Sequence, residues 1–396
     1  MRTRQDIENL EDKILAPYAM RSKDSGGRKY REEQHDIRTC YQRDRDRVVH
    51  CEAFRKLEYK TQVFVIYEGD YYRTRLTHTL EVAQIARTIG RTLQLNEDLI
   101  EAIALAHDLG HPPFGHAGEN ALNHLMASAR PRLKFNHNQR SFDIVAGLEK
   151  RYPDFDGLNL TKEVLVGILK HSTVYDQPGD SHYNKFVDEG PTLEAKVVDI
   201  ADSLAYLSHD IDDGITSGCI TGDDLKSSAL WNRAERMVGS AWEIKDKEIF
   251  KYQIVKALID MQMKDLLSFS NRKLKELTFR SFKEVKQYTY KNPNRSILGF
   301  SPSMENERKA LQKVLEKKFY KNYRVVRMTD KAKRIIHDLF NVYMKTPEQL
   351  PEKIYRPDRR RTKTEKYKII CDYIASMTDR FAIDEHKRLF DPNEKV

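Results

Sequence analysis

The sequence has little cysteine and no long apolar run. Its four cysteines, Cys40, Cys51, Cys219 and Cys371, form no closely spaced pair in 396 residues. A zinc knuckle and a disulfide framework both require such spacing, so we interpret all four as reduced thiols. A helix that crosses a bilayer requires about 18–20 consecutive apolar residues, and no segment approaches this length. These absences argue against a disulfide-built fold and against membrane-spanning helices.

A secretory signal is also missing, because residues 1–6 carry no apolar stretch. We therefore expect a soluble, cytoplasmic protein with no membrane partner. Hydrophobic residues make up 39% of the chain, which is enough for a core. The formal charge of +9 favours anionic partners, such as phosphorylated metabolites, nucleic acid or acidic proteins. Charge alone does not choose among these partners, or between them and a well-solvated surface.

Chemistry-bearing residues gather between residues 75 and 119. This segment contains His78, His107, His111 and His116, and the carboxylate Asp108 directly follows the second of these histidines. Two prolines and three glycines between Asp108 and residue 119 make the backbone there tight. Neutral imidazole and carboxylate are ligands that suit manganese, iron, magnesium or zinc. The composition is therefore typical of a metal site.

Apolar residues at three- and four-residue steps predict helices over residues 77–90 and 97–109. His78 then lies at the start of the first helix, and His107 and Asp108 at the end of the second. A single histidine on an apolar helix face is usually structural. A His-Asp pair is also weak evidence, because this sequence has four, beginning at His35, His107, His209 and His337. Only the second pair combines a preceding helix, a Gly-His-Pro-Pro turn and further histidines.

Another carboxylate, Asp202, falls in the apolar centre of a helix predicted over residues 194–210. Burying an unpaired carboxylate costs several kcal/mol, so Asp202 needs a cation. A metal held by His78, His107 and Asp108 would provide one. Tyr206 and Asp210 follow at four and eight residues, on the same helix face. They would line a ligand at the metal, although a tyrosine at this spacing is more often part of a core.

The rest of the chain predicts an all-α fold with at most a small β element. Further helices are expected at 120–126, 160–169, 241–290, on both sides of an apolar stretch at 323–328, and at 367–378. Residues 1–40 are expected to form a mobile arm with one short helix, and residues 61–67 a short strand or extended loop. Polar loops are expected at 176–190 and, unless they form the wall of an anion pocket, at 135–141. Residues 41–50 alternate in charge and favour either a solvent-facing salt-bridged helix or a subunit contact.

The order His78, His107-Asp108, Asp202 resembles the HD superfamily of metal-dependent phosphohydrolases. The segments 41–47, 60–64, 72–78, 107–119 and 377–380 are similar to the bacterial deoxyguanosine triphosphate triphosphohydrolases (dGTPases), and the animal SAM- and HD-domain dNTP triphosphohydrolase shares the same skeleton. The resemblance implies an HD-type helical fold with additional C-terminal helices. It also implies an N-terminal arm over 1–40, a phosphohydrolase core over 41–220 and a helical region over 221–396 that completes the nucleotide pocket and the oligomer contacts.

The activity implied by the resemblance is cleavage of a dNTP, with dGTP favoured, into deoxynucleoside and inorganic triphosphate. The implied metal ligands are His78, His107, Asp108 and Asp202. The expected ion is Mn²⁺ or Mg²⁺, with Fe²⁺, Co²⁺ and Zn²⁺ as alternatives. Such an ion polarises an α-phosphate oxygen and lowers the pKa of the water that attacks phosphorus.

The resemblance also assigns roles to the remaining polar residues. His116 is the expected catalytic acid, Glu119 orients it, and His111 either lines the outer part of the site or shares the acid role. The expected substrate contacts are Arg75 and His137 on phosphate, Gln62, Val63 and Tyr206 on the deoxyribose, and Asp210 on the 3′-hydroxyl. Two positions depart from the bacterial pattern. Ser203 replaces a second aspartate after Asp202, and Phe381 replaces a tyrosine, which affects tuning of the metal site and the base pocket.

The resemblance implies a homo-oligomer, a hexamer or a tetramer, with a regulatory dNTP and weak single-stranded DNA binding as further partners. Two other functions are open. One is an HD phosphohydrolase that acts on a nucleoside monophosphate or a signalling nucleotide. The other is a nucleic-acid-binding protein or nuclease that uses the lysines of 283–322 and the basic run 359–363.

Overall fold

The computed structural model describes residues 1–63, 72–173, 190–242, 244–293, 295–356 and 361–395. The helices are α1 (Arg4–Ile14), α2 (Cys40–Val49), α3 (Glu52–Lys56), α4 (Arg75–Thr92), α5 (Glu97–Ala106), α6 (Gly115–Ala127), α7 (His137–Asp143), α8 (Lys162–Leu169), α9 (Leu193–Thr216), α10 (Gly222–Leu225), α11 (Ala229–Ala241), α12 (Lys247–Leu277), α13 (Phe282–Lys291), α14 (Pro302–Lys318), α15 (Tyr323–Lys345), α16 (Lys363–Ala375) and α17 (Asp379–Phe390). Short helical turns occur at Ser22–Asp24, Leu57–Tyr59, Ile144–Leu148 and Pro347–Gln349.

The prediction of an all-α fold is confirmed. Within the described ranges, extended pairing is limited to two isolated bridges, Arg28 with Thr161 and Thr61 with Thr74. The second bridge lies at the start of the segment 61–67 for which a strand or extended loop was expected, while 64–67 fall outside the described residues. Among all the described residues, no helix is long and apolar enough to cross a membrane.

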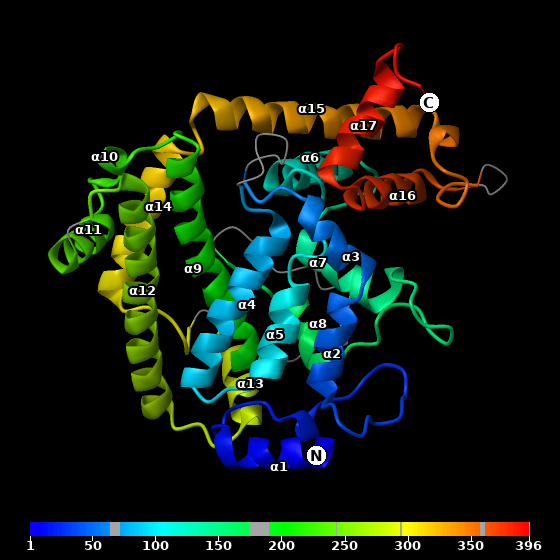
Figure 1. Ribbon diagram of the computed structural model, residues 1–396. Coiled ribbons are helices and arrows are strands. Elements are labelled where there is room, and N and C mark those ends of the chain that lie inside the picture. The colour runs from blue at the N-terminus through cyan, green and yellow to red at the C-terminus, as the bar shows by residue number, and fades with distance from the viewer. Residues whose placement is uncertain (64–71, 174–189, 243, 294, 357–360, 396) are drawn as a thin grey trace.

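The helices α4, α5 and α9 form the centre of the molecule, and α2 packs on α5 (Figure 1). Helix α4 begins where the Thr74 side chain accepts a hydrogen bond from the Thr77 amide, and α5 begins in the same way at Asn96. Such caps satisfy amide groups that the first turn of a helix leaves unpaired. The caps and the packing together bring the first turn of α4 and the last turn of α5 beside the middle of α9.

Two hydrophobic clusters meet along α9. Leu204 and Ala205 belong to the cluster that joins α9 to α4, α5 and α8. Leu207 and Ile211 belong to the cluster that joins α9 to α6, α11 and α15. Figure 1 shows α15 lying across the molecule above α6, with α16 and α17 near it. The polar residues of α9 thus lie where the two apolar bodies come together. The predicted division at residues 40 and 220 stays a prediction.

Most predicted helices are present, but three segments differ. Residues 135–141 do not form a loop, because Asn136 caps α7, which begins at His137. The helix predicted over 241–290 is two helices, since Thr278 adopts a left-handed conformation with φ 49° and ends α12. The last predicted helix ends at Ala375, and Thr378 caps a further helix, α17. The apolar stretch 323–328 is the beginning of α15.

The N-terminal arm is attached to the body of the protein. The Met20 amide, which is buried, donates a 2.8 Å hydrogen bond to Glu194 of α9. Arg28 forms a 2.5 Å ion pair with Asp44, which is completely buried in α2. Helix α2 therefore carries buried pairs as well as the surface pairs expected from its alternating charges. The loop expected at 176–190 lies, up to residue 189, outside the described residues, as do Arg359 and Arg360.

Candidate metal centre

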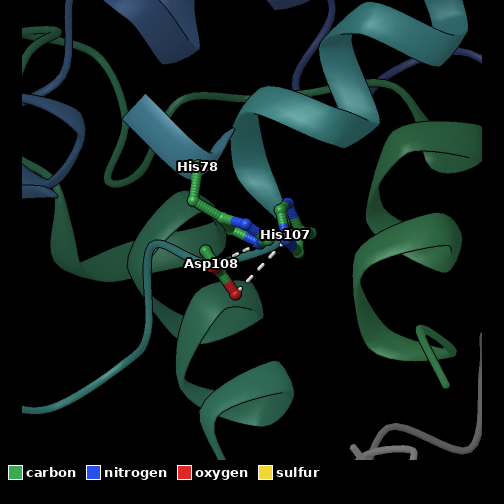
Figure 2. A group of neighbouring side chains, drawn as sticks. All are labelled: His78, His107 and Asp108. Carbon is green, nitrogen blue, oxygen red and sulfur yellow. Dashed lines mark ion pairs between the residues drawn. The ribbon is translucent and has the colours of Figure 1, made fainter. Parts of the chain in front are cut away.

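Four predicted ligands, His78, His107, Asp108 and Asp202, converge at the ends of α4 and α5 and the middle of α9; we call them the metal centre. Figure 2 shows His78, His107 and Asp108 pointing toward one another. The Nε2 atom of His107 lies 3.3 Å from Asp108 Oδ1, and His78 Nε2 lies 4.0 Å from Asp108 Oδ2. Asp202 Oδ1 is 2.9 Å from His78 Nε2. Nitrogen and oxygen donors of this kind at these separations suit one divalent cation.

His107 fits a metal ligand for a specific reason. Its Nδ1 lies 2.6 Å from the Ala104 carbonyl, which can only accept, so Nδ1 carries the proton. The lone pair is then on Nε2, which is buried and has no hydrogen-bond partner within the described residues. A buried polar atom without a partner is costly. A cation at Nε2 removes this cost, and a hydrogen bond at the opposite nitrogen is the usual support of a metal-bound histidine.

The charges at the centre favour cation binding. Burial by itself would raise the pKa of Asp108, but the nearby His107 and Arg75 outweigh it and hold that pKa well below its usual value. Burial is likewise outweighed at Asp202, whose pKa is lowered by hydrogen bonds from His171 and His78. Burial lowers the pKa of His107. Two ionised carboxylates therefore face a neutral imidazole, the protonation state in which these groups bind metals.

His171 was not predicted from the sequence. It follows α8 and is buried, with Nδ1 2.7 Å from Asp199 Oδ1 and Nε2 3.4 Å from Asp202 Oδ2. Burial alone would lower the pKa of His171, but the two carboxylates raise it well above its ordinary value. Two features of the sequence could have indicated this role. His171 comes right after a predicted helix, and Asp199 and Asp202 are spaced to lie on one face of α9. His171 fixes the carboxylate of Asp202 from the side away from His78.

His209 is a second histidine whose role was not predicted. Its Nδ1 lies 3.3 Å from His78 Nδ1, and its Nε2 lies 2.5 Å from Glu81. Burial lowers the pKa of His209 to about 4. His209 thus supports the far side of the His78 ring. By contrast, the His337-Asp338 pair lies elsewhere: His337 contacts His124, and Asp338 pairs with His386 at 2.9 Å.

Next to the metal centre lie His111, His116, Glu119 and His137, which we call the acid cluster. His111 connects the two groups, since its Nε2 is 3.3 Å from Asp108 Oδ1 and its ring stacks on His137 at 3.8 Å. Glu119 contacts both other histidines, but it lies closer to His137 Nδ1, at 2.9 Å, than to His116 Nδ1, at 3.5 Å. Glu119 therefore orients His137 as well as His116, a contact that the sequence did not predict.

Exposure and charge distinguish the histidines of the acid cluster. The side chain of His116 is 31% exposed, whereas that of His137 is 2% exposed. Burial, Arg75 and His137 together place the pKa of His111 well below its ordinary value, so His111 is neutral and a poor proton donor. Burial would raise the pKa of Glu119, but the surrounding histidines hold it far lower, so it stays ionised. Of the three histidines of the cluster, His116 is thus the one whose side chain a molecule outside the protein can reach.

Arg75 is almost completely buried between the metal centre and residues 61–63. Its Nη1 donates a 2.7 Å hydrogen bond to Asp108 Oδ2, and its Nε donates to the Thr61 carbonyl at 3.3 Å. The Nη2 atom has no hydrogen-bond partner among the described residues. A Cβ atom at Gly115 would lie 3.1 Å from Nη2, and Gly115 has φ +55°, so a side chain there would be strained and would crowd this nitrogen. Arg75 can therefore orient Asp108 and still bind an anion.

The predicted sugar-side residues come from two chain segments. On α9, the ring of Tyr206 lies 6.3 Å from that of His116, and Asp210 accepts a hydrogen bond from the Tyr320 hydroxyl. The other oxygen of Asp210 is buried without a partner in the described structure. Burial raises the pKa of Asp210 well above its usual value. Tyr320, from the segment between α14 and α15, was not predicted.

On the second segment, the Gln62 carbonyl lies 3.4 Å from the Cβ position of Gly115, so this segment passes beside the acid cluster. The Gln62 side-chain oxygen is buried without a hydrogen-bond partner in the described structure. Val63 packs against the apolar cluster that contains Phe114. Of the residues predicted to contact deoxyribose, Gln62 therefore lies beside the first residue of α6, whereas Tyr206 is on α9.

Lys60 and Asp379 hold the segment between the metal centre and the acid cluster. The side-chain nitrogen of Lys60, which is buried, donates to the carbonyls of His111 and Ala375. Asp379 accepts hydrogen bonds from the amides of Thr61 and Phe114, each at 2.9 Å. The C-terminal helices thus fix the positions of residues 111–114. Segments 60–64 and 377–380 both carry the family resemblance, but the contacts of Lys60 and of Asp379 were not predicted from the sequence.

The two departures from the expected pattern lie outside the metal centre. Ser203 Oγ accepts a 2.9 Å hydrogen bond from Arg308 of α14, which also donates to Gln262. Phe381 is exposed on α17. Neither residue replaces a ligand.

Comparison with known proteins agrees with this geometry. Residues 75–214 match the HD domain, and residues 298–388 match the phosphohydrolase-associated domain. A deoxyguanosinetriphosphate triphosphohydrolase-like protein of Geobacter metallireducens is 48% identical over 96% of both chains. One from Geobacter sulfurreducens is 46% identical over 99% of both chains, and one from Ralstonia nicotianae is 44% identical over 95% of this chain and 94% of its own. The chain therefore belongs to the deoxyguanosinetriphosphate triphosphohydrolase-like family of HD-domain phosphohydrolases.

Proposed function

We propose that this protein is a metal-dependent dNTP triphosphohydrolase that cleaves a dNTP, dGTP foremost, into deoxynucleoside and inorganic triphosphate. The observation that carries the proposal is the contact between the metal centre and the acid cluster: His111 Nε2 of the acid cluster lies 3.3 Å from Asp108 Oδ1 of the metal centre. Chemistry at an α-phosphorus requires charge stabilisation and a proton donor side by side. The similar proteins from Geobacter and Ralstonia are named after this activity, as deoxyguanosinetriphosphate triphosphohydrolase-like proteins.

His78, His107, Asp108 and Asp202 would hold the divalent ion, for which Mn²⁺ and Mg²⁺ are our first choices. When bound, such an ion supplies Lewis-acid polarisation of a phosphoryl oxygen and a more acidic water. The unpartnered Nη2 of Arg75 binds a phosphate oxygen, while Nη1 keeps Asp108 in place. His137, oriented by Glu119, faces the same phosphates.

His116 protonates the departing 5′ oxygen, and Glu119 supports the resulting change of charge on the ring. The free oxygen of Asp210 accepts a hydrogen bond from the 3′-hydroxyl, and Tyr206 packs on the sugar. Gln62 and Val63 close the pocket near C2′, where a ribose hydroxyl would be excluded.

The test is incubation of the purified protein with each of the four dNTPs and with GTP, in manganese or magnesium. Products are separated by ion-exchange chromatography. We expect deoxynucleoside and triphosphate from one or more dNTPs, and no products from Asp108→Ala. Cleavage only in dNTP mixtures would point to a regulatory dNTP. Release of single phosphates, or hydrolysis of a monophosphate alone, would overturn the proposal in favour of another HD chemistry.

We also propose that the enzyme works in the cytoplasm as a homo-oligomer, a hexamer or tetramer, and binds single-stranded DNA weakly. The support is the family resemblance together with the charge of +9. Light scattering on the purified protein measures the subunit number. DNA binding that persists in His116→Ala while hydrolysis is lost would separate a nucleic-acid function from the enzyme.

A further inference from the structure

Both ring nitrogens of His78 face residues of α9. Its Nε2 lies 2.9 Å from Asp202 Oδ1, and its Nδ1 lies 3.3 Å from His209 Nδ1. Asp202 and His209 are about two helical turns apart and therefore lie on the same face of α9. The helix thus contacts this metal ligand at the nitrogen that would bind the ion and also at the opposite nitrogen.

The contact between the two histidines requires one hydrogen donor and one acceptor. A neutral imidazole carries its proton on one nitrogen and a lone pair on the other. If His209 Nδ1 accepts, the proton of His78 is on Nδ1 and its lone pair is on Nε2, where a cation can bind. If His209 Nδ1 donates, a neutral His78 carries its proton on Nε2 and cannot bind a metal there. The proton position on His209 therefore decides whether His78 can act as a ligand.

Glu81 determines that proton position. The Nε2 atom of His209 lies 2.5 Å from Glu81 Oε2, and the Arg73 guanidinium contacts the same oxygen at 3.1 Å. Burial would raise the pKa of Glu81, but the contacts with His209 and Arg73 lower it to about 2, so the carboxylate can only accept. The Nε2 atom of His209 consequently carries the proton, and its Nδ1 has the lone pair that accepts from His78.

The surroundings of His209 oppose the other arrangement, which needs protons on both of its nitrogens. The His209 side chain is 5% exposed, and a second proton would bury a positive charge close to that of Arg73. Arg73 is itself fixed by α9, through Asp213 at 2.7 Å and Asp212 at 2.9 Å. Glu81 is therefore held in the position from which it accepts the His209 proton.

We propose that Glu81 and His209 are positioning residues that keep the proton of His78 on Nδ1 and its lone pair on Nε2, toward the metal. The inference rests on the metal centre of the proposed function and does not require hydrolysis of a dNTP. A backbone carbonyl, that of Ala104, does the same for His107. At His78 the proton is fixed by side chains, and Glu81 is 41% exposed, so this control can be removed without opening the core.

The test is the affinity of the full-length protein for Mn²⁺, measured by competition with a chelator, in Glu81→Ala, His209→Ala and the double variant. Glu81→Gln retains an oxygen that can accept a hydrogen bond. The matched control is Glu101→Ala, which removes a carboxylate that pairs with Arg87 and Arg45. NMR of the zinc-loaded protein with ¹⁵N-labelled histidine shows which nitrogen of His209 carries the proton.

We expect Glu81→Ala and His209→Ala each to weaken Mn²⁺ binding by about 10- to 100-fold, as is usual for residues that orient a metal ligand. Because Glu81 acts through His209, the double variant should bind no more weakly than His209→Ala. Glu81→Gln should retain most of the affinity, and Glu101→Ala should match the parent. NMR should place the His209 proton on Nε2.

Additive losses in the double variant, or a proton on His209 Nδ1 in the parent, would overturn the proposal. If His209→Ala does not fold, Glu81→Ala decides alone, since an affinity equal to that of the parent would overturn it too. A parent protein that binds neither Mn²⁺ nor Zn²⁺ would overturn the proposed function as well. A failed hydrolysis assay with normal metal binding would count against the proposed function only.

Discussion

The metal centre and the acid cluster are adjacent but differ in access and in charge. The His107 side chain is 1% exposed, whereas that of His116 is 31% exposed. In the metal centre, two carboxylates are kept ionised by imidazoles and by Arg75. In the acid cluster, one carboxylate, Glu119, serves two histidines. The comparison teaches that the first region suits a buried cation, whereas the second leaves one imidazole accessible from outside the protein.

Of the changes that test this difference, removing the charge of Asp108 should have the largest effect on activity and metal content. Asp108→Asn takes an anionic ligand from the cation and leaves the buried guanidinium of Arg75 without its counter-charge. We expect hydrolysis to fall by about 1,000-fold or more, with loss of bound metal and lower stability. Product release, elemental analysis and thermal unfolding measure the three effects. The matched control is Asp338→Asn, in the His-Asp pair outside the site. Retained metal in Asp108→Asn would contradict the assignment.

His116→Gln should separate the acid cluster from the metal centre. Loss of a general acid lowers kcat by about 100- to 1,000-fold, while the metal ligands are untouched. We therefore expect normal metal content and little change in KM. His124→Gln, on the same helix but exposed and near its end, is the control. If His116→Gln lost metal as well, the division into two regions would be wrong.

His171→Ala tests whether a histidine outside the predicted set positions Asp202. Residues that hold a ligand in place typically change metal affinity by about 10- to 100-fold. We expect weaker metal binding of this size, measured by competition with a chelator. His386→Ala, which removes a His-Asp contact far along the chain, should leave the affinity unchanged. An unchanged affinity in His171→Ala would show that Asp202 needs no such support.

The smallest effect concerns Lys60, between the two regions. Burial lowers the pKa of Lys60 from 10.5 to about 7. Between these values the unfolded chain binds the proton and the folded protein does not, so stability rises with pH across this window. The Lys60→Met variant has no titrating group at this position, so its stability lacks this dependence on pH. The difference in free energy of unfolding, wild type minus variant, should increase from pH 7 to pH 10 in urea titrations. A constant difference would mean that Lys60 keeps its proton in the folded protein.

The segments that were predicted well are those whose signal is local. Helices α4 and α5 follow from apolar spacing and from their caps at Thr74 and Asn96, and these place His78 and His107-Asp108 at helix ends. Asp202 was predicted as a ligand because an acidic residue on the apolar face of a helix requires a cation. The loop predicted for residues 135–141 was wrong for a local reason too, because polar side chains typical of a loop belong to a capped helix, α7. The alternative, a wall of an anion pocket, stays a prediction.

The contacts that were missed join segments far apart in the chain. Thr61 and Asp379 are separated by 318 positions, and Tyr320 and Asp210 by 110. His171 has no neighbouring carboxylate in the sequence, and its partners come from a helix that begins after it. No local pattern encodes such pairs, since they depend on how the helices pack.

The sequence by itself indicated the helices and the candidate ligands, with His78, His107 and Asp108 at helix ends and Asp202 within a helix, because periodicity and capping act within a few residues. Only the tertiary structure decided which side chain orients which, and which groups carry charge. His171 between two carboxylates, Glu119 bound closer to His137 than to His116, and the lowered pKa of Lys60 are examples. The reason is that charge state and hydrogen bonding depend on burial and on distances across the fold.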